Sequence, residues 1–261
     1  MDLDLREKNA LVCGSTQGIG KATALELASL GATITLLARD ETKLKSTLNE
    51  LSSEQSQKHN FVAADFNFPD QVKSAIDKLV SETEFHILIN NTGGPPAGLA
   101  IDSKPEDFLT AINAHLICSQ ILVQACVPAM KRNRYGRILN IISTSVKIPI
   151  KGLGISNTVR GAMASWSKTL SLELAQFGIT VNNILPGSTK TGRIESLIQT
   201  RSQKSGKSED EIRQEMIDEI PVGRMAEASE IAAAVAFLAS PAAAYINGVN
   251  LSVDGGRTGS L

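Results

Sequence analysis

The chain has 261 residues, a formal net charge of −1, 42% hydrophobic residues and 20% charged residues. These values are typical of a globular protein with a sizeable core, and they exclude the collagen, coiled-coil and disordered classes. The near-neutral charge favours neither nucleic acid nor an anionic membrane as a partner. No run approaches the roughly 20 apolar residues of a membrane-spanning helix. The charged residues 1–8 do not resemble a signal peptide, so we expect a cytoplasmic protein.

Short apolar runs alternate with longer amphipathic segments along the chain. The runs predict strands at 8–13, 33–38, 61–64, 86–90, 137–142, 179–184 and 250–253. The amphipathic segments predict helices at 19–30, 40–51, 69–80, 105–131, 154–177 and 229–239. Because each strand is apolar on both faces, we expect one α/β domain over 1–261, a doubly wound Rossmann domain with a parallel seven-stranded sheet and helices on both faces. The polar segment 188–221 predicts a flexible lid with a short helix over the substrate.

A glycine-rich turn joins the first predicted strand to the first predicted helix. Its sequence is Gly14-Ser15-Thr16-Gln17-Gly18-Ile19-Gly20. A doubly wound fold binds a dinucleotide at this place, because glycines let the pyrophosphate approach the backbone and the helix N-terminus offers free N–H groups. The spacing is not the commoner G-x-G-x-x-G, and a plain strand-to-helix turn is the alternative. The position after the first strand favours cofactor binding.

The end of the second predicted strand indicates which dinucleotide is preferred. An acidic residue there would bind the ribose 2′-hydroxyl of NAD. The first polar residue is instead Arg39, whose guanidinium suits the 2′-phosphate of NADP. The neighbouring Asp40 weakens this argument without reversing it, so NADP(H) is favoured over NAD(H).

Metal binding is not expected. The three cysteines (Cys13, Cys118 and Cys126) and the three scattered histidines form no metal-ligand pattern. The cysteines are therefore expected to be buried thiols.

Taken together, these features resemble the short-chain dehydrogenase/reductase family, and most of all its 3-oxoacyl-acyl-carrier-protein reductase-like branch. The similarity covers nearly the whole chain. Besides the glycine-rich turn, the matching positions are Asp65, Asn90-Asn91-Thr92-Gly93, Asn113, Asn140-Ile-Ile-Ser143, Pro186-Gly187 and the stretch from Tyr245 to Gly256. The resemblance implies an NADP(H)-dependent oxidoreductase that acts on the carbonyl or alcohol of a small-molecule or acyl-thioester substrate. It also implies a homotetramer.

The resemblance assigns roles to the matching positions. The cofactor contacts that it implies beyond the turn are Asp65, Asn91 and Gly93 on the adenosine side and Pro186, Gly187 and Thr191 on the nicotinamide side. Ser143 would hold the substrate carbonyl, and Asn113 would support a water-filled proton path. For Asn91 and Asn113, structural support of loop and helix is the alternative, because polar residues near strand ends often satisfy backbone groups.

The catalytic motif departs from the family. Where the family has Tyr-x-x-x-Lys, this chain has Ser156-Asn-Thr-Val-Arg160. The family tyrosine donates a proton to the carbonyl oxygen, whereas a serine hydroxyl is a far weaker acid. Arg160 stays protonated and is expected to bind the cofactor ribose or to orient a donor. The two tyrosines of the chain, Tyr135 and Tyr245, precede strands and should lie at the opposite edge of the sheet.

Three interpretations remain open. In the first, Ser143, Ser156 and Arg160 polarise a carbonyl, with Lys147, Lys151 or water as the proton source. In the second, the substrate needs a different donor, as an enoyl thioester or an imine would. In the third, the chain is a cofactor-binding sensor, scaffold or partner subunit with little turnover.

Overall fold

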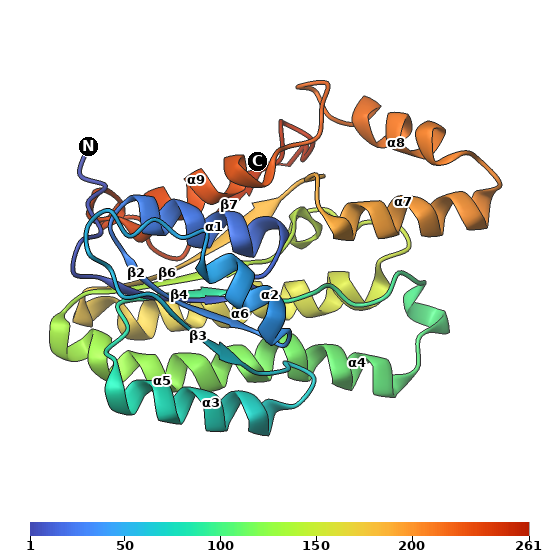
Figure 1. Ribbon diagram of the computed structural model, residues 1–261. Helices are drawn as coiled ribbons and strands as arrows, with labels where there is room; N and C mark the ends of the chain where they lie inside the picture. The colour runs from blue at the N-terminus through green and yellow to red at the C-terminus, as the bar shows by residue number, and fades with distance from the viewer. Residues whose placement is uncertain (261) are drawn as a thin grey trace.

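The computed structural model describes residues 1–260 and contains one seven-stranded sheet with helices on both faces (Figure 1). All neighbouring strands are parallel, in the order β3-β2-β1-β4-β5-β6-β7. The strands are β1 (Asn9–Cys13), β2 (Thr33–Ala38), β3 (Asn60–Ala63), β4 (Ile87–Asn90), β5 (Gly136–Ile141), β6 (Ile179–Pro186) and β7 (Asn250–Val253). The strand order reverses direction between β1 and β4, which confirms the predicted doubly wound fold.

Two helical layers cover the sheet. The first holds α1 (Gly18–Ser29), α2 (Glu41–Leu48) and α9 (Ala228–Ala239). The second holds α3 (Pro69–Glu82), α4 (Pro105–Ile112), α5 (Cys118–Asn133) and α6 (Gly154–Leu174). Figure 1 shows α1 and α9 on one side of the strands and α3, α5 and α6 on the other.

The alternation of side chains along β1 explains why the strands are apolar without interruption. Ala10 and Val12 pack into the core under α1 and α9, whereas Leu11 and Cys13 pack into the core under α3 and α5. Successive side chains of a strand point to opposite faces, so a strand covered on both sides must be apolar at every position.

The segment 188–221 is more ordered than its polar sequence predicts. It forms two helices, α7 (Gly192–Ser205) and α8 (Glu209–Asp218), instead of a flexible stretch with one short helix. Ile198, Ile212 and Met216 are buried together between them. A capping box of Ser208 and Glu211 begins α8. A few apolar residues at helical spacing are enough to form these two helices, because each helix needs only one narrow apolar stripe to pack against the other.

The helix predicted at 105–131 is interrupted by a π-helical turn at Asn113–Ile117, between α4 and α5. By length and composition, Pro105–Asn133 could cross a membrane, with 44% of its most apolar window buried. In this structure it packs against α3, α6 and the sheet. That packing places part of its apolar surface in the protein core.

Candidate active site

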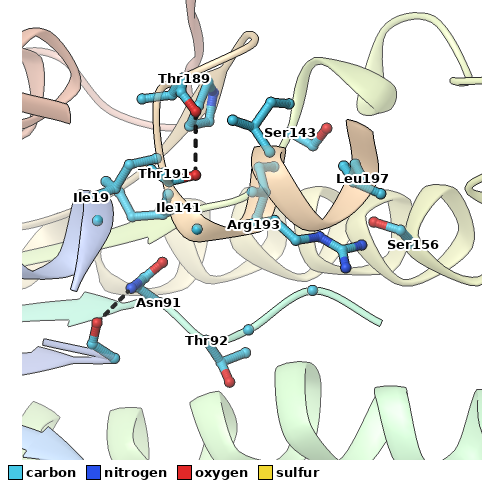
Figure 2. A pocket seen from close by; sticks show the side chains of 18 of the residues that line it. Ile19, Asn91, Thr92, Ile141, Ser143, Ser156, Thr189, Thr191, Arg193 and Leu197 are labelled. Atoms are coloured by element: carbon cyan, nitrogen blue, oxygen red, sulfur yellow. Dashed lines mark hydrogen bonds between the residues drawn. The ribbon is translucent and has the colours of Figure 1, made fainter. Parts of the chain in front are cut away.

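A cleft of about 580 Å³ opens at the carboxyl ends of the strands. Residues that follow β1, β2, β3, β4, β5 and β6 line it, together with α6 and the first turns of α7. Figure 2 shows Ser143, Ser156 and Arg193 at one end of this cleft and Ile19 at the other. Doubly wound proteins bind ligands at this edge of the sheet, where the strand order reverses.

The glycine-rich turn has the geometry that a dinucleotide phosphate needs. Gly14 and Gly18 have φ values of +58° and +54°, which favour glycine. A Cβ at Gly20 would lie 2.2 Å from the Gly14 carbonyl oxygen. The N-terminus of α1 has no side-chain cap and no acidic residue in its first turn. Free N–H groups and the helix dipole therefore face the cleft, and the residues present fit a pyrophosphate group.

The structure gathers most of the predicted cofactor residues in the cleft. Those that line it are Gly14, Thr16, Gln17, Gly18, Ile19, Arg39, Asp65, Asn91, Gly93, Arg160, Pro186, Gly187 and Thr191. Ser15 and Gly20 are outside the lining. Ser15 is fully buried and its hydroxyl donates to the Leu37 carbonyl at 3.5 Å, so it supports the turn from behind.

Asn91 braces the glycine-rich turn. Its side-chain amide donates to the carbonyl oxygens of Cys13 and Gly14, at 3.2 and 3.3 Å (Figure 2). These two bonds join the end of β4 to the end of β1 and satisfy acceptors that the turn leaves open. The side chain of Asn91 therefore supports the backbone of the turn, and Asn91 also lines the cleft.

The end of β2 presents Arg39 rather than Asp40 to a ligand. The Asp40 carboxylate accepts the backbone N–H of Lys43 at 3.0 Å and caps α2. Arg39 is exposed, lines the cleft and has no ion-pair partner among residues 1–260. The side chain available for an anionic group at this place is thus a guanidinium.

The end of the cleft formed by β5 and α6 is lined by Ser143, Ser156 and Arg160. Ser143 Oγ accepts the backbone N–H of Ser145 at 3.1 Å, which leaves its own proton free to be donated. Ser156 and Arg160 lie one turn apart on α6, and each is 8% exposed. The Arg160 guanidinium donates to the Ile141 carbonyl at 2.8 Å, while its Nε has no partner within the described chain.

The buried charge of Arg160 has no carboxylate partner in the described part of the chain. Burial, followed by the nearby charge of Arg193, lowers the pKa of Arg160 to about 10. The guanidinium therefore remains charged at neutral pH and can stabilise negative charge that develops on a ligand.

Neither tyrosine lines the cleft, which confirms the placement predicted for both. The Tyr135 hydroxyl donates to the Ala239 carbonyl at 2.7 Å, and burial raises the pKa of Tyr135. Tyr245 is fully exposed. Lys147 and Lys151 also lie outside the lining, so the chain places serine hydroxyls but no phenol or ammonium beside Arg160.

Asn113 is not brought into the cleft. It is exposed on the π-helical turn, whereas His115 is 3% exposed and faces a small cavity with Asn90 and Arg160. Two residues along a helix turn through about 200°, so the two side chains point to nearly opposite sides. Burial, followed by the charge of Arg160, lowers the pKa of His115 to about 2 and keeps the imidazole neutral. His115 was not among the predicted site residues, although its place on the buried face of this helical segment can be counted from the sequence.

The first turn of α7 contributes two further residues to the cleft. Thr191, the N-cap of α7, donates its hydroxyl to the Thr189 carbonyl at 3.2 Å (Figure 2). Arg193, which the sequence analysis did not single out, donates to the Pro95 carbonyl at 2.6 Å. This bond ties the segment 188–221 to the loop after β4.

Comparisons with known proteins cover almost the whole chain. The model of the enoyl-(acyl carrier protein) reductase family matches residues 14–258. A 3-oxoacyl-(acyl-carrier-protein) reductase from Haemophilus influenzae is 32% identical over 253 residues, which cover 97% of this chain and 98% of that protein. A tropinone reductase homolog from Arabidopsis thaliana is 33% identical over 252 residues, covering 95% and 89%. The solved structure of L-sorbose reductase from Gluconobacter frateurii, complexed with NADPH and L-sorbose, has a TM-score of 0.93 at 28% identity over 100% of both chains.

Proposed function

The chain belongs to the short-chain dehydrogenase/reductase family of NAD(P)-dependent oxidoreductases, and we propose that it is an NADP(H)-dependent reductase of a polarised double bond, a carbonyl first of all. The observation that carries this proposal is the continuity of one cleft. It joins the uncapped N-terminus of α1 to Ser143, Ser156 and Arg160. A 3-oxoacyl thioester and a smaller ketone are both substrates of the proposed class.

The preference for NADP(H) rests on Arg39. Its guanidinium is free at the end of β2 while Asp40 serves as a helix cap. L-sorbose reductase, which has the same fold, binds NADPH. In this proposal the pyrophosphate lies at the N-terminus of α1 and the 2′-phosphate at Arg39. The remaining contacts are Asp65, Asn91 and Gly93 on the adenosine side, with Pro186, Gly187, Thr191 and Arg160 toward the nicotinamide.

NADPH, when bound, supplies a hydride. The residues of the chain would then stabilise the negative charge that develops on the substrate oxygen. Ser143 and Ser156 would donate hydrogen bonds to that oxygen, and the charged Arg160 would lower its energy. Donors of this kind contribute about 2.7–4 kcal/mol each to a transition state. Because a serine hydroxyl is a weak acid, water is the proposed final source of the proton.

The absence of a phenol from the cleft favours a second candidate, conjugate reduction of an enoyl substrate. Among the described residues, Tyr135 and Tyr245 both lie away from the lining. Hydride addition to an activated alkene gives an enolate, which a guanidinium and two hydroxyls can hold without immediate proton transfer. A chain that binds the cofactor but has little turnover is the third outcome that the following experiment separates.

The test combines cofactor binding with turnover. NADPH binding is titrated by fluorescence, and NADPH oxidation is then assayed with acetoacetyl thioesters, ketones, quinones and enoyl thioesters. We expect Ser156→Ala and Arg160→Ala each to lower kcat/KM by about a hundredfold to a thousandfold, as the loss of a transition-state donor does. Thr158→Ala is the matched control, because Thr158 is exposed on the same helix and outside the cleft.

Each outcome decides between the candidates. Turnover of ketones supports the first, and turnover of enoyl thioesters alone supports the second. If neither Ser156→Ala nor Arg160→Ala changes kcat/KM, the roles assigned to Ser156 and Arg160 are wrong. If Ser156→Tyr with Arg160→Lys creates reductase activity that the natural chain lacks, the chain is a cofactor-binding protein.

We also propose a cytoplasmic homotetramer. Exposed apolar side chains on α4, the π-helical turn and α6 support contacts between copies, namely Leu109, Ile117 and Leu172. Light scattering after size exclusion should then give about four times the 27.7 kDa of one chain. A monomeric mass would remove the proposed assembly.

A further inference from the structure

The charged lining of the cleft is almost entirely positive, although the whole chain has a net charge of −1. Among residues 1–260, the only acidic residue that lines it is Asp65, which follows β3. The cations that line it are Arg39, Arg160, Arg193, Arg201 and Arg257. A cleft lined by one sign of charge attracts ligands of the other sign.

Two of these arginines have an assigned counter-charge. Arg257 forms an ion pair with Glu219 at 2.5 Å, and Arg39 is the proposed partner of the 2′-phosphate. Arg160, Arg193 and Arg201 have no acidic partner among residues 1–260. These three lie beyond the glycine-rich turn, at the substrate end of the cleft.

Arg193 lies at the substrate end of the cleft. It is half-buried, and its guanidinium lies 3.2–3.3 Å from the place that a Cβ on Gly94 would occupy. Only one of its donors is used, on the Pro95 carbonyl. In Figure 2 the guanidinium extends beneath α7 toward the side of the cleft where Ser156 lies. Its remaining donors are therefore available to a ligand in front of the serines.

The spacing along α7 places both of its arginines in the lining of the cleft. Arg193, Leu197 and Arg201 follow at four-residue spacing, and all three line the cleft. The acidic residue of the same turn, Glu195, faces the other way and forms an ion pair with Arg213 of α8 at 2.7 Å. The helix thus keeps its own carboxylate away from its cleft-facing arginines.

Arg160 supplies an independent observation. Its side chain is more than nine-tenths buried, its Nε has no partner, and the charge of Arg193 acts on it. Two nearby cations without an anion between them are costly in a partly buried site. An anionic ligand would remove that cost and satisfy the free donors.

We propose that the substrate carries a carboxylate, and that Arg193 binds it with support from Arg160 and Arg201. This inference rests on the proposed NADP(H)-dependent function, because it assigns the phosphates of the cofactor to the α1 N-terminus and Arg39. The apolar side chains at this end, Ile150, Leu153 and Leu197, favour an organic acid over a free inorganic anion. Arg193 is then a specificity-determining residue.

The test measures binding to protein that is first saturated with NADP⁺, by isothermal titration. The probes are 4-phenyl-2-oxobutanoate and 4-oxo-4-phenylbut-2-enoate, each compared with its methyl ester. We expect each free acid to bind at least tenfold more tightly than its ester, as a charge-assisted hydrogen bond gives. Arg193→Gln, which keeps a donor for Pro95 but removes the charge, should bring the two affinities within threefold of each other.

Two further variants control for charge and for folding. Arg193→Lys should restore part of the preference for the acid. Lys204→Met removes a positive charge from an exposed position in the last turn of the same helix, outside the cleft lining, and should keep the whole preference. Equal binding of acid and ester, no binding of either acid, or a preference that survives Arg193→Gln would overturn the inference and leave the cofactor proposal standing. A protein that fails to bind NADP⁺ at the first step would remove the proposed function itself.

Discussion

Replacement of Gly20 by alanine tests the glycine-rich turn most sharply. The added Cβ would lie 2.2 Å from the Gly14 carbonyl oxygen and 2.6 Å from the Asn91 amide nitrogen. These atoms must separate by about 1 Å to reach ordinary contact, so the turn has to open. Overpacking of this kind costs about 1–3 kcal/mol of stability. The opened turn also weakens the two bonds of Asn91, each worth about 1 kcal/mol.

The same displacement moves the N–H groups that would hold the pyrophosphate. We expect the NADPH dissociation constant to rise by tenfold to a hundredfold, which corresponds to about 1.4–2.8 kcal/mol. Urea unfolding measures the stability, and fluorescence titration at a temperature where the variant is folded measures the affinity. Gly161→Ala is the matched control, since a Cβ there meets nothing within 4 Å. It should stabilise α6 by about 0.5–1 kcal/mol and leave NADPH affinity unchanged. If Gly20→Ala binds NADPH as the natural chain does, the turn is not the phosphate site.

Three further predictions concern the cofactor preference, the buried histidine and the packing of α7 against α8. Arg39→Ala should weaken NADPH by at least tenfold while NADH affinity stays within twofold, and an equal loss for both would contradict a 2′-phosphate contact. Because the folded-state pKa of His115 is about 2 and its usual value is 6.5, stability should fall as the pH drops below 6.5. At pH 5 this loss is about 2 kcal/mol, and His115→Gln should lack it when urea unfolding is compared at pH 7 and pH 5. Ile198→Ala empties the fully buried contact between α7 and α8 and should cost that pair about 2–5 kcal/mol. Hydrogen exchange should then accelerate in α7 and α8 and not in β4, and uniform acceleration would mean that α7 and α8 do not open as a separate unit.

The sheet was largely predictable because its strands are short apolar runs that end at glycine or polar residues. The runs 33–38 and 250–253 match β2 and β7 at both ends, and Ser143 and Ser156, to which the family resemblance pointed, both line the cleft. Local pattern is enough here, since each strand is covered on both faces and must be apolar throughout.

The features that were missed depend on contacts between distant parts of the chain. In the sequence, Arg193 looks like an ordinary cation at the start of a helix. Its place in the cleft becomes visible only in the structure, where Pro95, almost a hundred residues earlier, accepts its hydrogen bond. The pairing of α7 with α8 is decided by a few apolar residues in a polar stretch.

The most direct test of the account is a fluorescence titration of the unaltered chain with NADPH and, in parallel, with NADH. We predict saturable binding of NADPH and at least a tenfold weaker affinity for NADH. The reason is that Arg39 is available to bind the 2′-phosphate and the N-terminus of α1 is available to bind the pyrophosphate. Failure of both cofactors to bind would contradict the account, since every role proposed for Ser143, Ser156 and Arg160 depends on a cofactor in this cleft.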